Sequence, residues 1–371
     1  MPKVVNNTFI ATSSLTPSLD SEFGIYTSGS TIYFLSASSV QQLNLETGYF
    51  RIIEFTGSVN SNQASVYTYN VSPLVKLATF VAVGAGGGGG GGGRKDTTAI
   101  TRQAGGGGGS GAGLVVMTLL SQSLDASYTV TVPGSPPGGT GSATINGSGA
   151  SGTSGGNTTI GSIIIAPGGL SGAGGAISVG NGGEPSQNAR PGYLPYFLLG
   201  SEGGDSSTTL VTAGGGLQVP TSGKYRTTTF FRNAMNGIRG MAGAGAGGAI
   251  NTTNTSVAAT TGCGVNVYGT SVSAGSIGAT GTGGDAGVSP SNVLNAIHLF
   301  GISGSLLSCR FGVGAGGSGG ASTVTPGVPG GRGGDGGYFG AAGGGGGAAS
   351  GSRGGDGGSG SAGYVAILEF Y

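Results

Sequence analysis

The stretch Leu77-Ala-Thr-Phe-Val-Ala-Val-Gly-Ala-Gly86, continued by glycines up to Gly93, decides how this chain folds. Residues 77–83 are apolar and partly β-branched, which predicts a strand that runs directly into a glycine block. The chain closes on a second apolar strand, Tyr364-Val-Ala-Ile-Leu-Glu-Phe-Tyr371. We therefore expect the two strands to bracket one cooperative domain whose ends lie close together.

Glycine blocks recur along the rest of the chain, at 105–113, 168–183, 240–249, 312–320, 330–337 and 340–363. Gly and Pro together make up over a quarter of the 371 residues. Collagen needs Gly strictly at every third position, which the unbroken run Gly86–Gly93 excludes. Disordered chains combine low hydrophobicity with high net charge, whereas this chain is 36% hydrophobic and 7% charged, with a net charge of +1. The glycine is therefore architectural.

Such a composition needs a compensating source of stability, because each glycine in regular structure costs about 0.5–1 kcal/mol relative to alanine. Backbones without Cβ atoms can approach closely, and extended helices with three residues per turn leave every N–H free to bond a neighbour. We therefore expect an all-β or irregular fold, a glycine-rich sandwich of polyglycine-II-like helices and short strands. Many short strands joined by glycine turns are the alternative.

Residues 1–70 contain little glycine and predict a small all-β N-terminal region, followed by a glycine-rich domain over 71–371. Its short aromatic and β-branched segments are Gly24–Tyr26, Thr31–Leu35, Tyr49–Phe55 and Ala64–Tyr69. A short helix is expected only at residues 291–300. The N-terminus lacks the apolar segment of a secretory signal, and no stretch approaches about 18 consecutive apolar residues, so we expect a soluble chain made in a cytoplasm.

Two cysteines and two short repeats have simple structural interpretations, as reduced thiols and local ion pairs. Cys263 and Cys309 are expected to be reduced, partly buried thiols, although an oxidising exterior leaves a disulfide open. The repeats Arg332-Gly-Gly-Asp335-Gly-Gly and Arg353-Gly-Gly-Asp356-Gly-Gly lie 21 residues apart. Arg and Asp three apart project from the same edge of a polyglycine helix, which predicts a local ion pair. An RNA-binding RGG region would need many repeats in a basic chain.

The order of several elements resembles the glycine-rich domain that ends many tailed-bacteriophage tail fibres and adhesins. In that family a strand precedes a glycine run, two strands follow with a Thr/Val-rich hairpin, a Gly-Thr-Thr-x-x-Gly element precedes an Ala-Pro-Gly-Gly turn, and a Gly-Tyr-Val strand ends the domain. The counterparts are Phe80–Gly86, Gly113–Leu119 with Tyr128–Pro133, Asn157–Gly161 with Ser162–Gly169, and Ala362–Ile367. The likeness covers roughly residues 76–371, and residues 1–70 match nothing familiar.

This resemblance implies a virion protein at the distal end of a fibre that contacts the host. In the related adhesins of T-even-type phages, polyglycine helices form a rigid sandwich, and the segments between glycine blocks act as recognition loops. The resemblance implies binding to a host polysaccharide or outer-membrane protein, attachment to other virion proteins through residues 1–70, and location in the tail fibre after synthesis in the host cytoplasm. A homotrimer and a single copy that caps a trimer both remain open. Nucleic-acid binding and membrane insertion are not expected.

The segments where glycine is scarce are the candidate contact sites, because loops on a rigid scaffold commonly carry binding residues. They are Arg94–Ala104, Glu184–Glu202, Gly223–Met241 and Ser289–Phe300. The third holds four of the 14 basic residues beside three aromatics, which suits phosphate or acidic-sugar groups and stacking on a sugar ring. Its receptor-binding candidates are Lys224, Tyr225, Arg226, Phe230, Phe231, Arg232 and Arg239.

Insert 184–202 adds the candidates Tyr193, Tyr196 and Phe197. The insert is more apolar than a solvated loop, so it either buries against a neighbouring subunit or anchors a protein receptor. The aromatics of insert 223–241 have a simpler alternative role, in which they hold the insert down while its charges are solvated.

Enzymatic function is not expected, and neither a cofactor nor a metal is implied. His298 is the only histidine, which excludes a multi-histidine metal site, and it lies in the apolar context 295–300. Acidic residues are sparse, although Asp205 and Asp285 could still meet in space. Matches to Gly-x-Gly-x-x-Gly lack the strand–turn–helix context that gives the motif meaning.

Two function classes therefore compete. The first is a bacteriophage tail-fibre tip protein that binds a host receptor during adsorption. The second is a purely structural virion protein, such as a head fibre, decoration, collar or baseplate component without host contact. A glycine-rich ice-binding or cell-wall protein is a third class, and the regular Gly-x-x spacing or secretion signal that would favour it is missing from the sequence.

Overall fold

The computed structural model describes residues 51–59, 61–98, 103–177, 179–183, 200, 202–209, 242–262, 316–337 and 339–371, and elsewhere only the backbone of short strands. Within these residues the fold is all-β and irregular, as the composition predicts. Its only helical element there is the 3-10 turn η1 (Ser121–Ser123). The predicted helix at 291–300, Cys263 and Cys309 lie outside the described residues.

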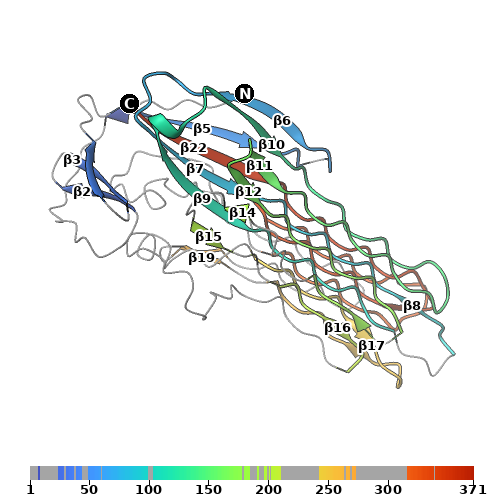
Figure 1. The fold of residues 1–371 in the computed structure, drawn as a ribbon. Coiled ribbons are helices and arrows are strands. Elements are labelled where there is room, and N and C mark those ends of the chain that lie inside the picture. The colour runs from blue at the N-terminus through green and yellow to red at the C-terminus, as the bar shows by residue number, and fades with distance from the viewer. Residues whose placement is uncertain are drawn as a thin grey trace.

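A six-stranded antiparallel sheet forms one layer at one end of the molecule (Figure 1). Its order is β1 (Asn7–Thr8), β5 (Tyr49–Thr56), β22 (Tyr364–Phe370), β7 (Leu77–Val83), β9 (Leu114–Leu120) and β15 (Tyr196–Leu198). The predicted strands before and after the glycine blocks, β7 and β22, are direct neighbours in full register, from Leu77 opposite Phe370 to Val83 opposite Tyr364. The two strands that bracket the glycine blocks therefore lie side by side, as expected.

A five-stranded antiparallel sheet packs against the first and completes a β-sandwich. Its order is β14 (Arg190–Pro191), β12 (Ile164–Ala166), β11 (Thr158–Ile160), β10 (Ser127–Val132) and β6 (Ser65–Asn70). Alternate residues of β10 point inward and meet alternate residues of β7, as the two-residue period of a strand requires. Phe80, Tyr69 and Tyr128 form an aromatic group between the sheets, with ring centroids 5.8 to 6.2 Å apart.

The remaining strands are short. A three-stranded meander contains β2 (Gly24–Ser28), β3 (Thr31–Ser36) and β4 (Ser39–Leu43). Antiparallel pairs join β13 (Val179–Gly180) to β16 (Ser206–Ser207), β17 (Ala249–Ile250) to β18 (Ser256–Val257), and β19 (Val265–Val267) to β20 (Thr270–Val272). One parallel pair joins β8 (Arg94–Lys95) to β21 (Ala349–Ser350).

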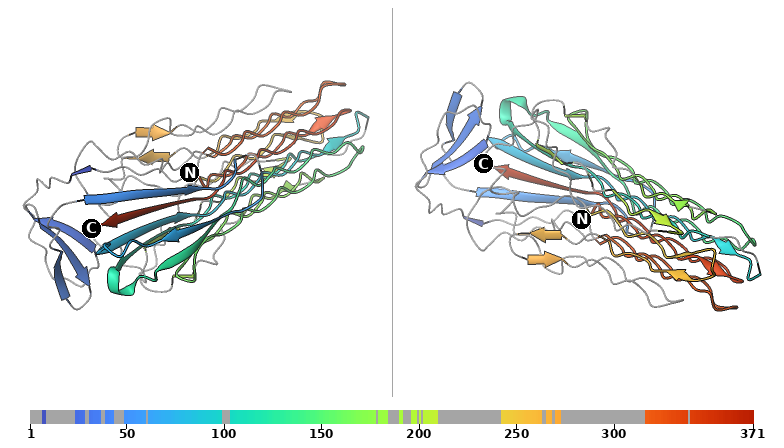
Figure 2. Two further views of the ribbon diagram at one scale, coloured as in Figure 1. Left: turned by 90° about the horizontal axis from the view of Figure 1, so that it is seen from above. Right: turned by 90° about the horizontal axis from the view of Figure 1, so that it is seen from below.

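The glycine segments pack side by side as extended helices, which we call the polyglycine bundle. It consists of residues 84–94, 104–113, 134–142, 147–156, 167–176, 179–183, 200, 202–206, 242–250, 256–262, 316–323, 330–336, 340–350 and 353–363. Strands lead straight into it: β7 continues as 84–93, and 353–363 returns into β22. Figure 1 shows the segments running along the long axis as interleaved coils, and the two views of Figure 2 show that the bundle extends away from the sandwich.

Hydrogen bonds of segment 84–94 have a period of three residues. Successive N–H groups donate to three different neighbours, with donor–acceptor distances of 2.8 to 3.2 Å. Those of Gly86, Gly89 and Gly92 reach residues 355–361, those of Gly87, Gly90 and Gly93 reach 104–110, and those of Gly88, Gly91 and Arg94 reach 147–153. Its carbonyls accept from residues 343–349, 169–175 and 139–142. Six described neighbours with threefold periodicity are the bonding pattern of polyglycine II, which confirms the expected helices over the alternative of glycine turns.

Glycine is required because the backbones in the bundle approach too closely for side chains. A Cβ at Gly90 would lie 1.9 Å from the carbonyl oxygen of Ala173, and one at Gly106 would lie 1.9 Å from that of Gly90. The hydrogen bonds gained along every segment replace the hydrophobic core that a chain without side chains cannot form.

Strand pairing corrects two expectations. The boundary predicted at residue 70 separates residues that share sheets, because β5 pairs with β22 and β6 pairs with β10. Residues 49–70 are therefore built into the sandwich. The strands β9 and β10, expected with a hairpin, lie in different sheets, and η1 carries the chain from one sheet to the other.

Both Arg-Gly-Gly-Asp repeats form the predicted local ion pairs. Arg332 contacts Asp335 and Arg353 contacts Asp356, and all four side chains are partly exposed. Each carboxylate also accepts a backbone N–H from an adjacent segment: Ser359 donates to Asp335 at 2.7 Å, and Gly141 donates to Asp356 at 2.8 Å. The repeats therefore tie neighbouring segments of the bundle together.

One carboxylate is fully buried at the far end of the sandwich. Glu369, 0% exposed, accepts hydrogen bonds from Tyr69 Oη at 2.7 Å and Tyr371 Oη at 2.8 Å. The Nε atom of Arg51 lies 3.7 Å from Glu369 Oε2. Burial raises the pKa of Tyr69 above its ordinary value, and the hydrogen bond to Glu369 raises it further.

The raised pKa of Tyr69 predicts a loss of stability in alkali. Above pH 10 the unfolded state releases the Tyr69 proton while the folded state keeps it, so the free energy of unfolding falls as pH rises, by about 1.4 kcal/mol per pH unit for each such group. Burial also raises the pKa values of Tyr128 and Tyr371. In Tyr69→Phe the free energy of unfolding should fall less steeply between pH 10 and pH 12, because one fewer proton is released on unfolding. Chemical denaturation at each pH measures this slope. An unchanged slope would contradict the prediction.

Candidate functional site

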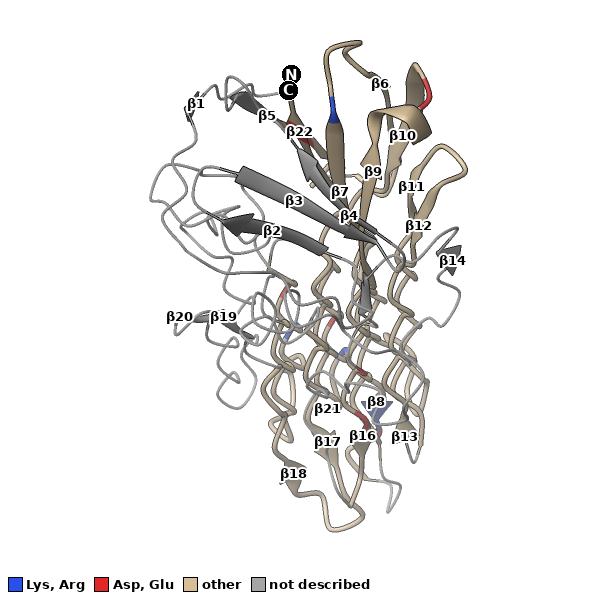
Figure 3. Ribbon diagram, turned by 60° about the vertical axis from the view of Figure 1, so that its left-hand side comes forward, with Lys and Arg blue, Asp and Glu red and all other residues tan. Residues whose placement is uncertain are grey.

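The distal turns, where the segments of the polyglycine bundle reverse direction farthest from the sandwich, form the candidate site (Figure 1). They are residues 94–98 with 103, 142–147, 176–177 with 179–180, 205–209, 250–256, 323–328 and 350–353. A rigid bundle brings these turns to one end because its segments run nearly parallel and are tied at every residue. Figure 3 shows that charged residues are thinly spread over the described part of the molecule.

Left-handed backbone conformations shape four of these turns, including 323–328, where Gly327 has φ of 80°. Asn146 has φ of 54°, Asn254 has φ of 57° and Gly351 has φ of 72°. Asn tolerates this region better than most residues because its short side chain forms local hydrogen bonds. In turn 250–256, the side chain of Asn251 accepts hydrogen bonds from the backbone N–H groups of Thr253 and Thr255.

Side chains of the first distal turn tie it to its neighbours. Gln103 is buried, and its Nε2 atom lies 3.4 Å from the Gly147 carbonyl and 3.3 Å from that of Gly175. Asp96 accepts from both the backbone N–H and the hydroxyl of Thr98 at 3.1 Å, and the backbone hydrogen bond chiefly lowers the pKa of Asp96. A guanidinium N–H of Arg94 donates to the Ala143 carbonyl. The described residues of the first distal turn are therefore tied to their neighbours by side-chain hydrogen bonds.

Exposed apolar side chains lie on two adjacent distal turns. Ile145 is 53% exposed and Ile177 is 56% exposed, and Val179 is also exposed. Their turns meet at Gln103, which binds a carbonyl on each side. Apolar groups that remain in solvent on a rigid support are available for contact with another molecule.

The predicted contact residues are distributed unevenly. Tyr196 and Phe197 lie on β15, opposite Val116 and Val115 of β9, so their backbone belongs to the edge of the sandwich. The other candidates lie outside the described residues: Tyr193, Lys224, Tyr225, Arg226, Phe230, Phe231, Arg232 and Arg239. Of the four predicted inserts, 94–104 has described residues at the distal end.

Sequence reasoning overlooked the distal residues Ile145, Ile177 and Lys95 as a group. Each turn contributes one or two residues, and turns that meet are far apart in sequence: Lys95 contacts Asn254, 159 residues away, and lies opposite Ser350. A signal existed in the turns themselves, because Thr144-Ile-Asn-Gly147 and Asn251-Thr-Thr-Asn254 interrupt glycine blocks with turn-forming residues. The side-by-side order of the segments decides which turns meet. The sequence of a single segment does not reveal this order.

No family model matches this chain, and no curated protein matches it. Among the described residues, no helix has the length and apolar character needed to cross a bilayer. The same residues contain no group of three or more His, Cys, Asp or Glu side chains placed to hold a metal ion.

Proposed function

We propose that this chain is a bacteriophage tail-fibre tip protein that binds a receptor on the host surface through its distal turns. The observation that carries the proposal is the polyglycine bundle, a long, rigid body tied by hydrogen bonds at every turn and ending in ordered turns. A rigid support lowers the entropic cost of placing contact residues, which favours binding. The resemblance of the order of elements to phage adhesins supports the same function.

In this proposal the protein acts by binding and not by catalysis. The bundle presents mainly backbone and small side chains, and the exposed groups at the distal end are apolar, hydroxyl and amide side chains together with Asp205 and Arg353. The partners would be a host polysaccharide or outer-membrane protein at the distal end and other virion proteins at the sandwich end. The chain would be located in the tail fibre, as a homotrimer or as a single copy that caps a trimer.

A structural virion component is the second candidate, and one observation favours it. The insert 263–315 leaves the bundle at Gly262 and returns at Gly316, and a Cβ at Gly262 would lie 2.3 Å from the Gly316 carbonyl oxygen. The two ends of this insert are therefore adjacent and lie at the sandwich end of their segments, opposite the distal turns. Inserts placed there suit contacts between subunits.

Charge introduced at the distal turns should weaken adsorption while the fold is kept. Ile145→Asp and Ile177→Asp each place a carboxylate on an exposed position, so the free energy of unfolding should change by less than about 0.5 kcal/mol. Binding of the labelled protein to host cells should weaken about tenfold for each substitution, which corresponds to ~1.4 kcal/mol. The measurement is flow cytometry of cells titrated with the full chain.

Leu74→Asp is the matched control, because Leu74 is 72% exposed at the sandwich end. It should leave cell binding unchanged. If the wild-type chain binds no cells, or if the three variants behave alike, the receptor-binding proposal fails. Labelling of this chain on the particle by electron microscopy would then decide for the structural component if the label lies on the head or collar.

A further inference from the structure

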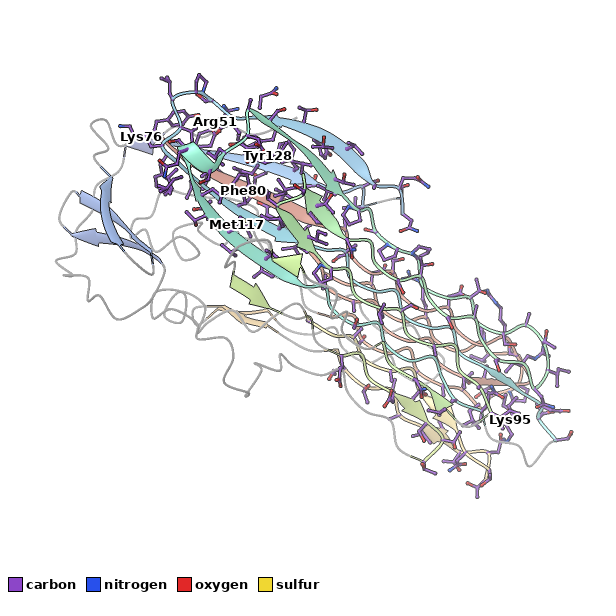
Figure 4. All side chains as sticks on the ribbon, viewed as in Figure 1. Arg51, Lys76, Phe80, Lys95, Met117 and Tyr128 are labelled. Carbon is purple, nitrogen blue, oxygen red and sulfur yellow. The ribbon has the colours of Figure 1, made fainter. Side chains whose placement is uncertain are left out.

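Lys95 is a buried cation at the distal end of the bundle, labelled in Figure 4. The residue is only 1% exposed, and its ammonium group donates to Asn254 Oδ1 at 3.0 Å. No described carboxylate forms an ion pair with it. An ammonium group has three donors, and the described residues supply an acceptor for one of them. A buried charge without a counter-charge is costly, and burial accordingly lowers the pKa of Lys95.

Two buried serine hydroxyls at the distal end of the bundle also have no hydrogen-bond partner among the described residues. Ser350 is fully buried and lies directly opposite Lys95 in the parallel pair of β8 and β21, so both side chains project from the same face. The buried hydroxyl of Ser256 follows Asn254 by two residues, at the end of the turn that reaches Lys95. Hydroxyls left unpaired inside a protein cost free energy, so each such group points to an additional acceptor or donor.

We propose that Lys95, Ser350 and Ser256 form a binding site for a small monovalent anion of the size of chloride. The ammonium group supplies the counter-charge, and the two hydroxyls donate to the same anion. Asn254 cannot serve instead of the anion, since its amide oxygen carries no net charge and accepts only one of the three ammonium donors.

Burial limits the size of the anion. Lys95 and Ser350 are buried, whereas Asn254 is exposed, so an anion would enter from solvent at the turn 250–256. A polymeric acidic sugar would need an exposed ammonium group. The bound anion would fasten turn 250–256 to residues 94–95 and 349–350, and this stabilising role does not depend on the proposed function.

Bromide replaces chloride at such sites and can be located directly. Crystals of the full chain grown in sodium bromide should show an anomalous peak within hydrogen-bonding distance of Lys95 Nζ and Ser350 Oγ. The peak should be missing in Lys95→Met. A non-anomalous peak at this place in both proteins would identify a water molecule and overturn the proposal.

Stability in solution gives a second, independent measurement. At equal ionic strength the apparent Tm of the wild type should be about 2 °C higher in sodium chloride than in sodium gluconate. Lys95→Met should remove this difference. Lys76→Met, which removes an exposed lysine at the sandwich end, should keep it. Equal anion dependence in all three proteins would overturn the site.

Ser350→Ala tests whether the Ser350 hydroxyl binds the anion or has no partner, because the two cases predict opposite changes in Tm in chloride. Removal of a buried hydroxyl without a partner is neutral or stabilising. If Ser350 binds the anion, the variant should have a lower Tm than the wild type in chloride and a Tm equal to or higher than the wild type in gluconate. A variant at least as stable as the wild type in both salts would contradict the proposal.

Discussion

Gly90→Ala is expected to destabilise the protein by more than about 3 kcal/mol and to leave little folded chain. Segment 84–94 is surrounded by six described neighbours, and the added Cβ would lie 1.9 Å from the Ala173 oxygen and 2.4 Å from its carbonyl carbon. Relief of this overlap must move residues 169–175 outward and break hydrogen bonds on both sides. Solubility on expression and the apparent Tm of any folded fraction measure the effect.

Gly327→Ala measures the cost of losing glycine's conformational freedom where no neighbouring backbone is close. Gly327 lies in a distal turn with φ of 80°, and a Cβ there meets no atom within 4 Å. Its substitution should cost only the strain of a left-handed alanine, about 1–2 kcal/mol. If Gly90→Ala were no more damaging than Gly327→Ala, close backbone approach would not be what makes the bundle need glycine.

Glu369→Ala is the second substitution with a large expected effect, a loss of about 3–5 kcal/mol. It would leave the buried Tyr69 hydroxyl without its acceptor and the nearby Arg51 without its counter-charge, and it would open a cavity between the sheets. Glu369→Gln keeps one oxygen acceptor and should lose less. The free energy of unfolding by guanidinium titration measures both.

Glu202→Ala is the control for the loss of an acidic side chain. Glu202 is exposed, so its substitution should change the free energy of unfolding by less than about 0.5 kcal/mol. A similarly small effect of Glu369→Ala would mean that the two tyrosines find other acceptors, and the buried network would then contribute little to stability.

Local sequence was sufficient for the parts of the fold that depend on local chemistry. The apolar stretch before Gly84 predicts β7, the Tyr364 stretch predicts β22, and unbroken glycine predicts helices with three residues per turn. The pairing of Arg332 with Asp335 also follows from their spacing. Each of these depends only on residues within one segment.

Long-range neighbours were not predictable in the same way. Tyr69 meets Glu369 across 300 residues, and Lys95 meets Asn254 across 159. Glycine segments are nearly identical along their length, so sequence offers almost no side-chain information about which segment lies beside which. The aromatic character of residues 49–70 predicted strands correctly but not that these strands complete the sandwich.

The threefold period of the hydrogen bonds also restricts how such a protein can change in length. One residue added to segment 84–94 would turn every following N–H by a third of a rotation, toward a different neighbour. An addition of three residues would restore each N–H to its former neighbour and lengthen the segment by one turn. Evolution can therefore lengthen or shorten the bundle only in triplets, while the distal turns, which lie outside this repeat, are free to vary by single residues.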